Sequence, residues 1–128
     1  MKKNKFSKNW IIKQKRDIYV KKSKLEGYRS RAVYKLQEIN DKFKIIKNNI
    51  SVIDLGAAPG SWSQYISRNF SNSKIISIDL KDIEPIKNLV HIKGDFTEEQ
   101  QKKNIKNYFG KKVDLIVSDM AVNTTGNK

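Results

Sequence analysis

The sequence contains no cysteine, one histidine and two prolines among its 128 residues. Without cysteine it can form neither a disulfide nor a thiolate metal site. No apolar run approaches the roughly 20 residues that cross a bilayer, and the Lys-rich N-terminus lacks the apolar core of a signal peptide. The single histidine, His91, lies inside a predicted strand, so we expect it to be structural. We therefore expect a cytoplasmic protein that uses neither a membrane nor a metal.

Acidic residues are scarce in the first part of the chain. Residues 1–49 contain 16 Lys and Arg against four Asp and Glu, whereas residues 50–128 contain 11 against nine, so most of the net charge of +14 precedes the first predicted strand. A genome that favours Lys codons would spread lysine along the whole chain. A basic segment beside a nearly neutral one is typical of proteins that bind a nucleic-acid backbone. An anionic membrane is the weaker alternative, because residues 1–25 show no apolar helical stripe.

Short apolar runs alternate with helical patterns along the rest of the chain. We expect buried strands at residues 52–55, 74–79, 89–92 and 113–118. A first helix is predicted to begin at a Ser30 cap and to run to Phe43, and a second to span residues 61–70. A capping box at residues 97–100 predicts a third. Strands that alternate with helices indicate an α/β fold, a Rossmann-like doubly wound parallel sheet.

Two boundaries follow from this pattern. Residues 1–25 form a basic N-terminal arm, and residues 26–128 form the α/β unit. After the fourth strand the polar run "DMAVNTTGNK" supplies no helix to cover it, although strands of a parallel sheet are normally buried on both faces. We therefore expect the N-terminal portion of a larger domain, truncated after the fourth strand.

The turn "IDLGAAPGSW" joins the first strand to the second helix, at the edge of the sheet where such folds bind ligands. Its glycines, Gly56 and Gly60, do not have the spacing of a dinucleotide fingerprint, and the turn has no P-loop Lys-Ser/Thr pair. This spacing disfavours a nicotinamide dehydrogenase. Asp79, at the end of the second strand, suits a ribose diol, and Asp95 of "GDF" suits an adenine amino group, although either alone is equally an ordinary turn residue. Together they describe S-adenosylmethionine, which carries ribose and adenine but no pyrophosphate.

Four motifs in order, "RSRAVYKLQEI", "DLGAAPGSWSQY", "GDF" and "SDMAVN", resemble the FtsJ/RrmJ family of RNA ribose 2′-O-methyltransferases. The resemblance runs from about Trp10 to the last residues. It implies S-adenosylmethionine-dependent methylation of a uridine ribose in large-subunit ribosomal RNA, with the large ribosomal subunit as partner and a monomeric complete enzyme. It also implies roles for individual residues. The implied cofactor contacts are Gly60, Trp62, Asp79, Asp95 and Asp119.

Lys35 and Asp119 match the first two members of the family's Lys-Asp-Lys-Glu catalytic tetrad. Lys35 borders the apolar stripe of its predicted helix, which lets its stem pack while its ammonium group reaches a cleft. The second Lys and the Glu would lie beyond Lys128, so we expect this polypeptide by itself to be inactive. Val122 stands where the family usually has proline. A non-catalytic RNA-binding or ribosome-associated module is the alternative function.

Two aromatic residues of the basic arm, Trp10 and Tyr19, allow two interpretations. They can stack on RNA bases, or they can anchor the arm to the domain. The sequence favours neither.

Overall fold

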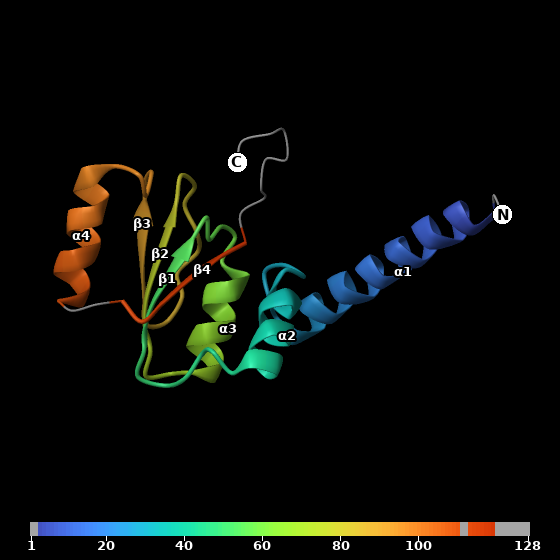
Figure 1. Cartoon of the computed structure of the whole chain (residues 1–128), viewed down its shortest axis with the longest axis horizontal. Coiled ribbons are helices and arrows are strands. Elements are labelled where there is room, and N and C mark those ends of the chain that lie inside the picture. The colour runs from blue at the N-terminus through green and yellow to red at the C-terminus, as the bar shows by residue number, and fades with distance from the viewer. Residues whose placement is uncertain (1–2, 111–112, 120–128) are drawn as a thin grey trace.

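The computed structural model describes residues 3–110 and 113–119. Its elements are α1 (Lys3–Glu26), α2 (Val33–Phe43), β1 (Ser51–Leu55), α3 (Ser61–Asn69), β2 (Lys74–Asp79), β3 (Leu89–Lys93), α4 (Glu99–Phe109) and β4 (Leu115–Ser118) (Figure 1). The strands form one parallel sheet in the order β3-β2-β1-β4. The predicted α/β class is confirmed, and each predicted strand is present.

Helices cover both faces of the sheet. In β1, Val52 points toward α2 and α3, where Leu36 and Ile66 are fully buried. The next residue, Ile53, points to the opposite face and packs in a second cluster that includes Phe109 of α4. This alternation follows from the two-residue repeat of a strand. In Figure 1, α4 accordingly lies on one side of the sheet and α3 on the other.

The strand register brings the carboxyl ends of the strands to one edge. Leu55 is paired with Ile78 of β2 and with Ser118 of β4. Asp79 and Asp119 each follow these partners by one residue, as Gly56 follows Leu55. The glycine turn and two of the predicted site carboxylates therefore meet at the same edge of the sheet.

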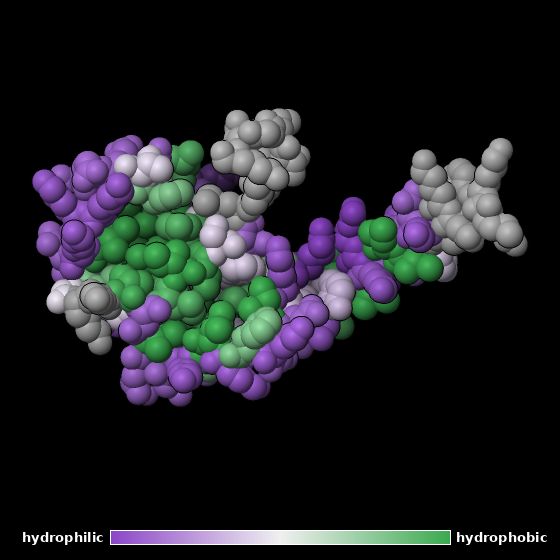
Figure 2. Space-filling view, in the orientation of Figure 1, coloured by the Kyte–Doolittle hydropathy of each residue, from purple (hydrophilic) through white to green (hydrophobic). Residues whose placement is uncertain are grey.

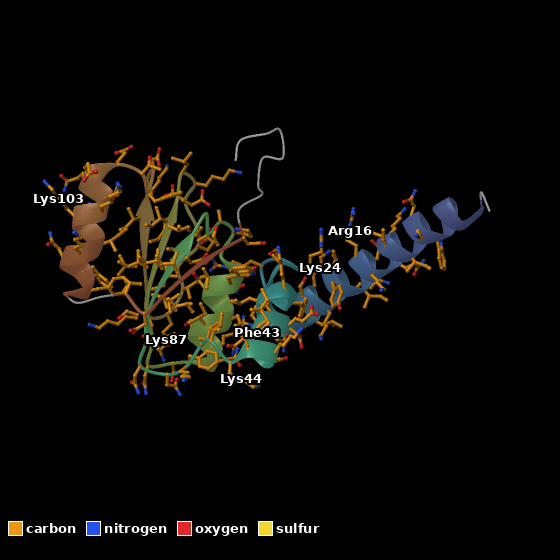
Figure 3. All side chains as sticks on the ribbon, viewed as in Figure 1. Arg16, Lys24, Phe43, Lys44, Lys87 and Lys103 are labelled. Carbon is orange, nitrogen blue, oxygen red and sulfur yellow. The ribbon has the colours of Figure 1, made fainter. Side chains whose placement is uncertain are left out.

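The helix α1 extends away from the sheet as a long arm (Figure 1). Arg68 of α3 fastens its end by donating hydrogen bonds to the carbonyls of Glu26 (2.9 Å) and Gly27 (2.8 Å), and its guanidinium group lies 4.5 Å from the Tyr28 ring centre. Arg16 and Lys24 are among the basic residues that project from it (Figure 3). The charge pattern of the sequence places the basic arm here but predicts no helix, because the helix has no apolar stripe.

The domain surface in Figure 2 carries hydrophobic residues over its middle, between the hydrophilic surfaces of α1 and α4. Ile116 of the edge strand β4 is 60% exposed. No helix in the described part of the chain is long and apolar enough to cross a membrane. The predicted loop after Asp119, which includes Val122, lies outside the described residues.

Two predicted helix caps are wrong. Ser30 does not cap α2, whose N-cap position is Ala32; its hydroxyl instead lies 2.8 Å from the Ser61 hydroxyl. The capping box at residues 97–100 also fails, because Thr97 donates its N–H and hydroxyl to Asp95, and α4 begins at Glu99. In both cases the hydroxyl has a partner outside the helix.

Candidate functional site

The glycine turn is held in shape by an arginine. Gly60 has φ +110°, and a Cβ atom there would lie 3.0 Å from Arg29 Nη1 and 3.2 Å from Ile86 Cδ1. Arg29 donates hydrogen bonds to the carbonyls of Pro59 (3.0 Å), Glu84 (2.8 Å) and Pro85 (3.0 Å). It thereby ties the turn to the loop after β2. Both the positive φ and the lack of space require glycine at this position.

Asp79 is oriented by the backbone around it. One carboxylate oxygen accepts the N–H of Ala58 and the other the N–H of Lys81, each at 2.9 Å. A carboxylate has about four lone-pair positions, so both oxygens can accept further hydrogen bonds. Asp79 lines a cavity of about 300 Å³. The other residues that line it are Gly56, Ile78, Leu80, Gly94, Asp95 and Phe96.

Asp95 lines the same cavity as Asp79. Its Oδ1 accepts the backbone N–H of Thr97 at 2.9 Å and the Thr97 hydroxyl at 2.7 Å. These hydrogen bonds lower the pKa of the Asp95 carboxyl. Asp95 is therefore an anionic hydrogen-bond acceptor that lines the cavity.

A third carboxylate, Asp54 at the end of β1, is 2% exposed. Its Oδ2 accepts the hydroxyl of Ser63 at 2.7 Å. Burial raises the pKa of Asp54 to about 6, and the charges of Asp119 and Asp79 add to this rise. The carboxylates of Asp54, Asp79 and Asp119 thus converge on the strand ends. Such a cluster is an environment that favours a cation.

Trp62 is 6% exposed and belongs to the core, with its indole N–H donating to the carbonyl of Ala32 at 2.7 Å. Trp62 also lines a narrow cavity of about 80 Å³. The glycine turn supplies most of the lining of this cavity, together with Ser30, Ala32, Asp54 and Asp119. The predicted cofactor contact of Trp62 thus coincides with a structural role at the start of α3.

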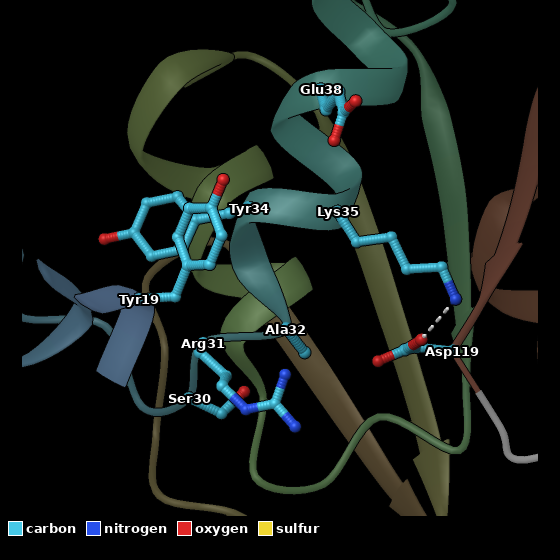
Figure 4. A pocket seen from close by; sticks show the side chains of 8 residues that line it. All are labelled: Tyr19, Ser30, Arg31, Ala32, Tyr34, Lys35, Glu38 and Asp119. Atoms are coloured by element: carbon cyan, nitrogen blue, oxygen red, sulfur yellow. Dashed lines mark hydrogen bonds and ion pairs between the residues drawn. The ribbon is translucent and has the colours of Figure 1, made fainter. Parts of the chain in front are cut away.

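Lys35 and Asp119 are 84 residues apart in the sequence, and the fold brings them together. Lys35 Nζ lies 3.3 Å from Asp119 Oδ1. Figure 4 shows the Lys35 side chain extending from α2 toward the carboxylate that follows β4. The side chains are 67% and 33% exposed, so both remain accessible to a ligand. They line a cavity of about 540 Å³ whose other walls are Tyr19, Ser30, Arg31, Ala32, Tyr34 and Glu38.

The three cavities adjoin one another through shared residues. The cavity at Asp79 shares Gly56 with the narrow one beneath the turn. The narrow cavity in turn shares Ser30, Ala32 and Asp119 with the cavity at Lys35. Five of the six predicted site residues therefore line these adjoining cavities at the carboxyl ends of the strands, which we together call the hollow. The sixth, Gly60, lies in the turn between two lining residues, Pro59 and Ser61.

His91 has a structural role, as its place in a strand predicts. Its Nδ1 lies 2.7 Å from the Ser77 hydroxyl, and its Nε2 lies 2.9 Å from the Lys81 carbonyl oxygen. The carbonyl can only accept, so Nε2 donates and Nδ1 accepts from Ser77. Among the described residues, no group of three or more His, Asp or Glu is arranged to hold a metal ion.

Several residues of this hollow are absent from the sequence prediction. Leu80 and Phe96 each follow a predicted carboxylate by one residue. Their position next to these carboxylates could have indicated that they line the same cavity. Arg29 and Arg31 are the two arginines of "RSRAVYKL". Nothing in the sequence shows that Arg29 fastens the turn while Arg31 lines the cavity, because this depends on the path of loops distant in sequence.

Comparison with known proteins identifies close relatives. The model of the FtsJ-like methyltransferase family matches residues 28–128. The chain is 64% identical over 128 residues to ribosomal RNA large subunit methyltransferase E of Pelagibacter ubique, a match that covers 100% of this chain and 63% of the relative. It is 49% identical to the protein of the same name from Rickettsia akari, covering 95% of this chain and 56% of that one. The chain thus spans less than two thirds of the length of these curated relatives.

A solved structure from Plasmodium falciparum, described as a ribosomal RNA methyltransferase, has the same fold. It superposes with a TM-score of 0.68 at 39% identity, over 78% of this chain and 60% of that one. The expected Rossmann-like methyltransferase fold is thereby confirmed.

Proposed function

Because this chain belongs to the FtsJ-like methyltransferase family, we propose that it carries the cofactor site and part of the catalytic site of an enzyme that methylates ribose 2′-hydroxyls in large-subunit ribosomal RNA. The observation that carries the proposal is the Lys35–Asp119 pair, 3.3 Å apart in a cavity that adjoins the glycine turn. The names of the relatives from Pelagibacter ubique and Rickettsia akari support the choice of RNA.

The residues that line the hollow support S-adenosylmethionine as its ligand. Asp79 and Asp95 would hold the ribose hydroxyls and the adenine amino group, and the apolar side chains of Leu80 and Phe96 line the same cavity. Gly60 and Trp62 would border the methionine part. The buried Asp54 and the nearby Asp119 supply negative charge for a cationic ligand. When bound, this cofactor supplies a methyl group activated by a sulfonium.

Lys35 and Asp119 act on the acceptor side. A ribose hydroxyl is a weak nucleophile because its pKa lies far above neutrality. The Lys35 ammonium group stabilises negative charge that develops on the hydroxyl oxygen. Asp119 orients that ammonium group through their ion pair and keeps it directed into the cavity. By resemblance to the family, the second Lys and the Glu of the tetrad complete the removal of the proton.

Two measurements test this function. Isothermal titration of the 128-residue chain with S-adenosylmethionine should show binding. For transfer, this chain is fused to the part of the Pelagibacter ubique relative that lies outside the match, and labelled methyl incorporation into large ribosomal subunits is counted. The fusion should be active, and both its Lys35→Ala variant and the 128-residue chain alone should show negligible transfer. RNA binding without any cofactor binding would favour the non-catalytic module instead.

A further inference from the structure

A groove runs between α1 and α2, away from the Lys35–Asp119 pair. The cavity of about 540 Å³ at that pair shares Tyr19, Tyr34 and Glu38 with a second cavity of about 480 Å³. The second cavity is further lined by Lys22, Gln37, Asp41 and Lys42. The two cavities therefore adjoin at Tyr19, Tyr34 and Glu38, and we call them together the groove.

Tyr19 presents an aromatic ring to this groove on a rigid backing. Its ring stacks on that of Tyr34, with centres 5.4 Å apart and an interplanar angle of 29°. Tyr34 is 8% exposed, its hydroxyl donates to Glu26, and the Tyr28 ring meets it edge-on. Tyr19 itself is 43% exposed. Tyr19 thus anchors the arm to the domain and also lines the groove, where it can contact a ligand.

Arg31 supplies a cation to the same cavity that Tyr19 lines. Of the two arginines in "RSRAVYKL", Arg29 is occupied by three backbone carbonyls. Within residues 3–110 and 113–119, the Arg31 guanidinium group has no hydrogen-bond or ion-pair partner, and it extends toward the Asp119 side of the cavity (Figure 4). Lys22, Lys35 and Lys42 also face the groove, against the acidic Glu38 and Asp41.

An exposed aromatic ring and an unpaired guanidinium group that line one cavity match one nucleotide of a single strand, because the ring stacks on the base and the cation contacts the phosphate. We propose that the groove binds the RNA strand next to the acceptor ribose, with Tyr19 as the stacking platform for an unpaired base and Arg31 as the contact to its phosphate. This rests on the proposed function for the identity of the acceptor, but the stacking itself does not require a bound cofactor.

The test compares two probes on the 128-residue chain. One is a single-stranded RNA of mixed sequence, about 12 nucleotides long to match typical single-strand sites, and the other is a ribose-phosphate oligomer of equal length without bases. Fluorescence anisotropy gives the ratio of the two affinities. Tyr19→Phe keeps the ring, whereas Tyr19→Leu keeps apolar packing on Tyr34 but removes the aromatic face. Trp10→Leu is the matched control, since Trp10 is a more exposed aromatic residue of the same helix, at 63%, outside the groove.

The wild-type chain should prefer the base-bearing RNA by about 10-fold, the effect of stacking one base. Tyr19→Phe and Trp10→Leu should retain this preference, and Tyr19→Leu should lose it. Arg31→Gln should weaken the binding of both probes by the same factor. An unchanged preference in Tyr19→Leu would overturn the proposal. Titration with S-adenosylmethionine separates the groove proposal from the proposed function. A chain that fails to bind the cofactor but keeps a Tyr19-dependent base preference would contradict the proposed function and leave the groove proposal standing.

One measurement needs no substitution and covers the case in which Tyr19→Leu misfolds. The same RNA with 5-iodouridine is irradiated on the wild-type chain, and the cross-linked peptide is identified by mass spectrometry. A cross-link at Tyr19 supports the groove. Cross-links found only at other residues refute it.

Discussion

Asp54 is a carboxylate that the fold desolvates at the end of β1. Its pKa is about 6 in the folded chain against an ordinary value of 3.8. The folded state therefore holds this proton more tightly than the unfolded state does. The contribution of Asp54 to the free energy of unfolding is therefore most favourable below about pH 4, decreases as the pH rises from about 4 to about 6, and stays constant above that. At 1.36 kcal/mol per unit, the decrease is about 3 kcal/mol.

Replacing Asp54 by Asn should remove this pH dependence, because the amide does not ionise. Relative to the wild-type chain, Asp54→Asn should gain stability by about 3 kcal/mol between pH 4 and pH 7. Urea denaturation of both chains across this range measures the difference, in which the titrations of all other groups cancel. A difference that does not change with pH would show that Asp54 keeps an ordinary pKa.

Asp79 and Lys35 should separate cofactor binding from catalysis. Asp79→Ala should weaken the binding of S-adenosylmethionine by about 1.5–3 kcal/mol, the range for hydrogen bonds to a charged group. Lys35→Ala should leave this affinity unchanged and lower kcat of the active fusion. The negative charge that Lys35 stabilises, on the oxygen of the acceptor hydroxyl, develops only in the transition state. Titration calorimetry and single-turnover methylation measure the two effects.

The control for Asp79 is Asp82→Ala, which removes a nearby carboxylate that is 76% exposed and paired with Lys93. It should bind the cofactor as the wild-type chain does. Loss of cofactor binding in Lys35→Ala together with normal binding in Asp79→Ala would reverse the assigned roles.

Among the elements, the strands were predictable and the ends of the helices were not. β2 spans the predicted residues 74–79, because its apolar run is buried on both faces and bounded by polar turns. The caps of α2 and α4 depend on partners that the sequence does not show, such as the Ser61 hydroxyl for Ser30. The helical state of α1 was missed for a related reason. An exposed helix needs no apolar stripe, so periodicity carries no signal for it.

The candidate site likewise contains residues whose positions were predictable from the sequence and contacts that were not. The positions of Asp79 and Asp95 were predictable because the strand ends of a parallel sheet share one edge, whereas Asp119 was implied by family resemblance. The contact of Lys35 with Asp119 was implied only by family resemblance, since it joins two segments 84 residues apart. The groove at Tyr19 depends on the angle at which α1 leaves the domain, and the hydrogen bonds of Arg68 help to set that angle.

The glycine turn is the element on which the site depends most directly. Gly60→Ala should destabilise the chain by about 1–3 kcal/mol, the cost of a strained backbone conformation, and should also weaken cofactor binding, because the new methyl group would displace Arg29. Gly110→Ala is the matched control. Gly110 also has a positive φ of +64°, but a Cβ atom there would meet nothing within 4 Å.

Thermal denaturation and cofactor titration distinguish the two variants. The Gly110 variant should lose some stability and keep its full cofactor affinity. Equal cofactor affinity in both variants would show that the shape of the turn does not matter for binding.

At the scale of the whole molecule, the net charge is concentrated in residues 1–49, which include the basic arm. Residues 1–49 carry a net charge of +12 and residues 50–128 a net charge of +2. Neutralising Lys8, Lys13 and Arg16 of α1 should make RNA binding less sensitive to salt. The log–log slope should fall by about 0.7 for each phosphate that the arm no longer neutralises. Filter binding at several salt concentrations measures the slope.

The control removes the same charge from α4, by neutralising Lys102, Lys103 and Lys106. This variant should keep the wild-type slope. If both triple variants change the slope equally, RNA binding depends on the total charge of the chain, and the arm does not form a distinct RNA-binding segment.

The exposure of α1 also makes its helix–coil equilibrium depend on RNA. Like charges such as Lys13 and Arg16, or Lys21 and Lys24, stand one turn apart and destabilise the helix by a few tenths of a kcal/mol each. Salt screens this repulsion, so circular dichroism of the free chain should show more helix as salt is added. RNA phosphates would screen it as well. The arm would then gain helical order on the RNA that it binds, and added salt, while releasing the RNA, would leave the helix formed.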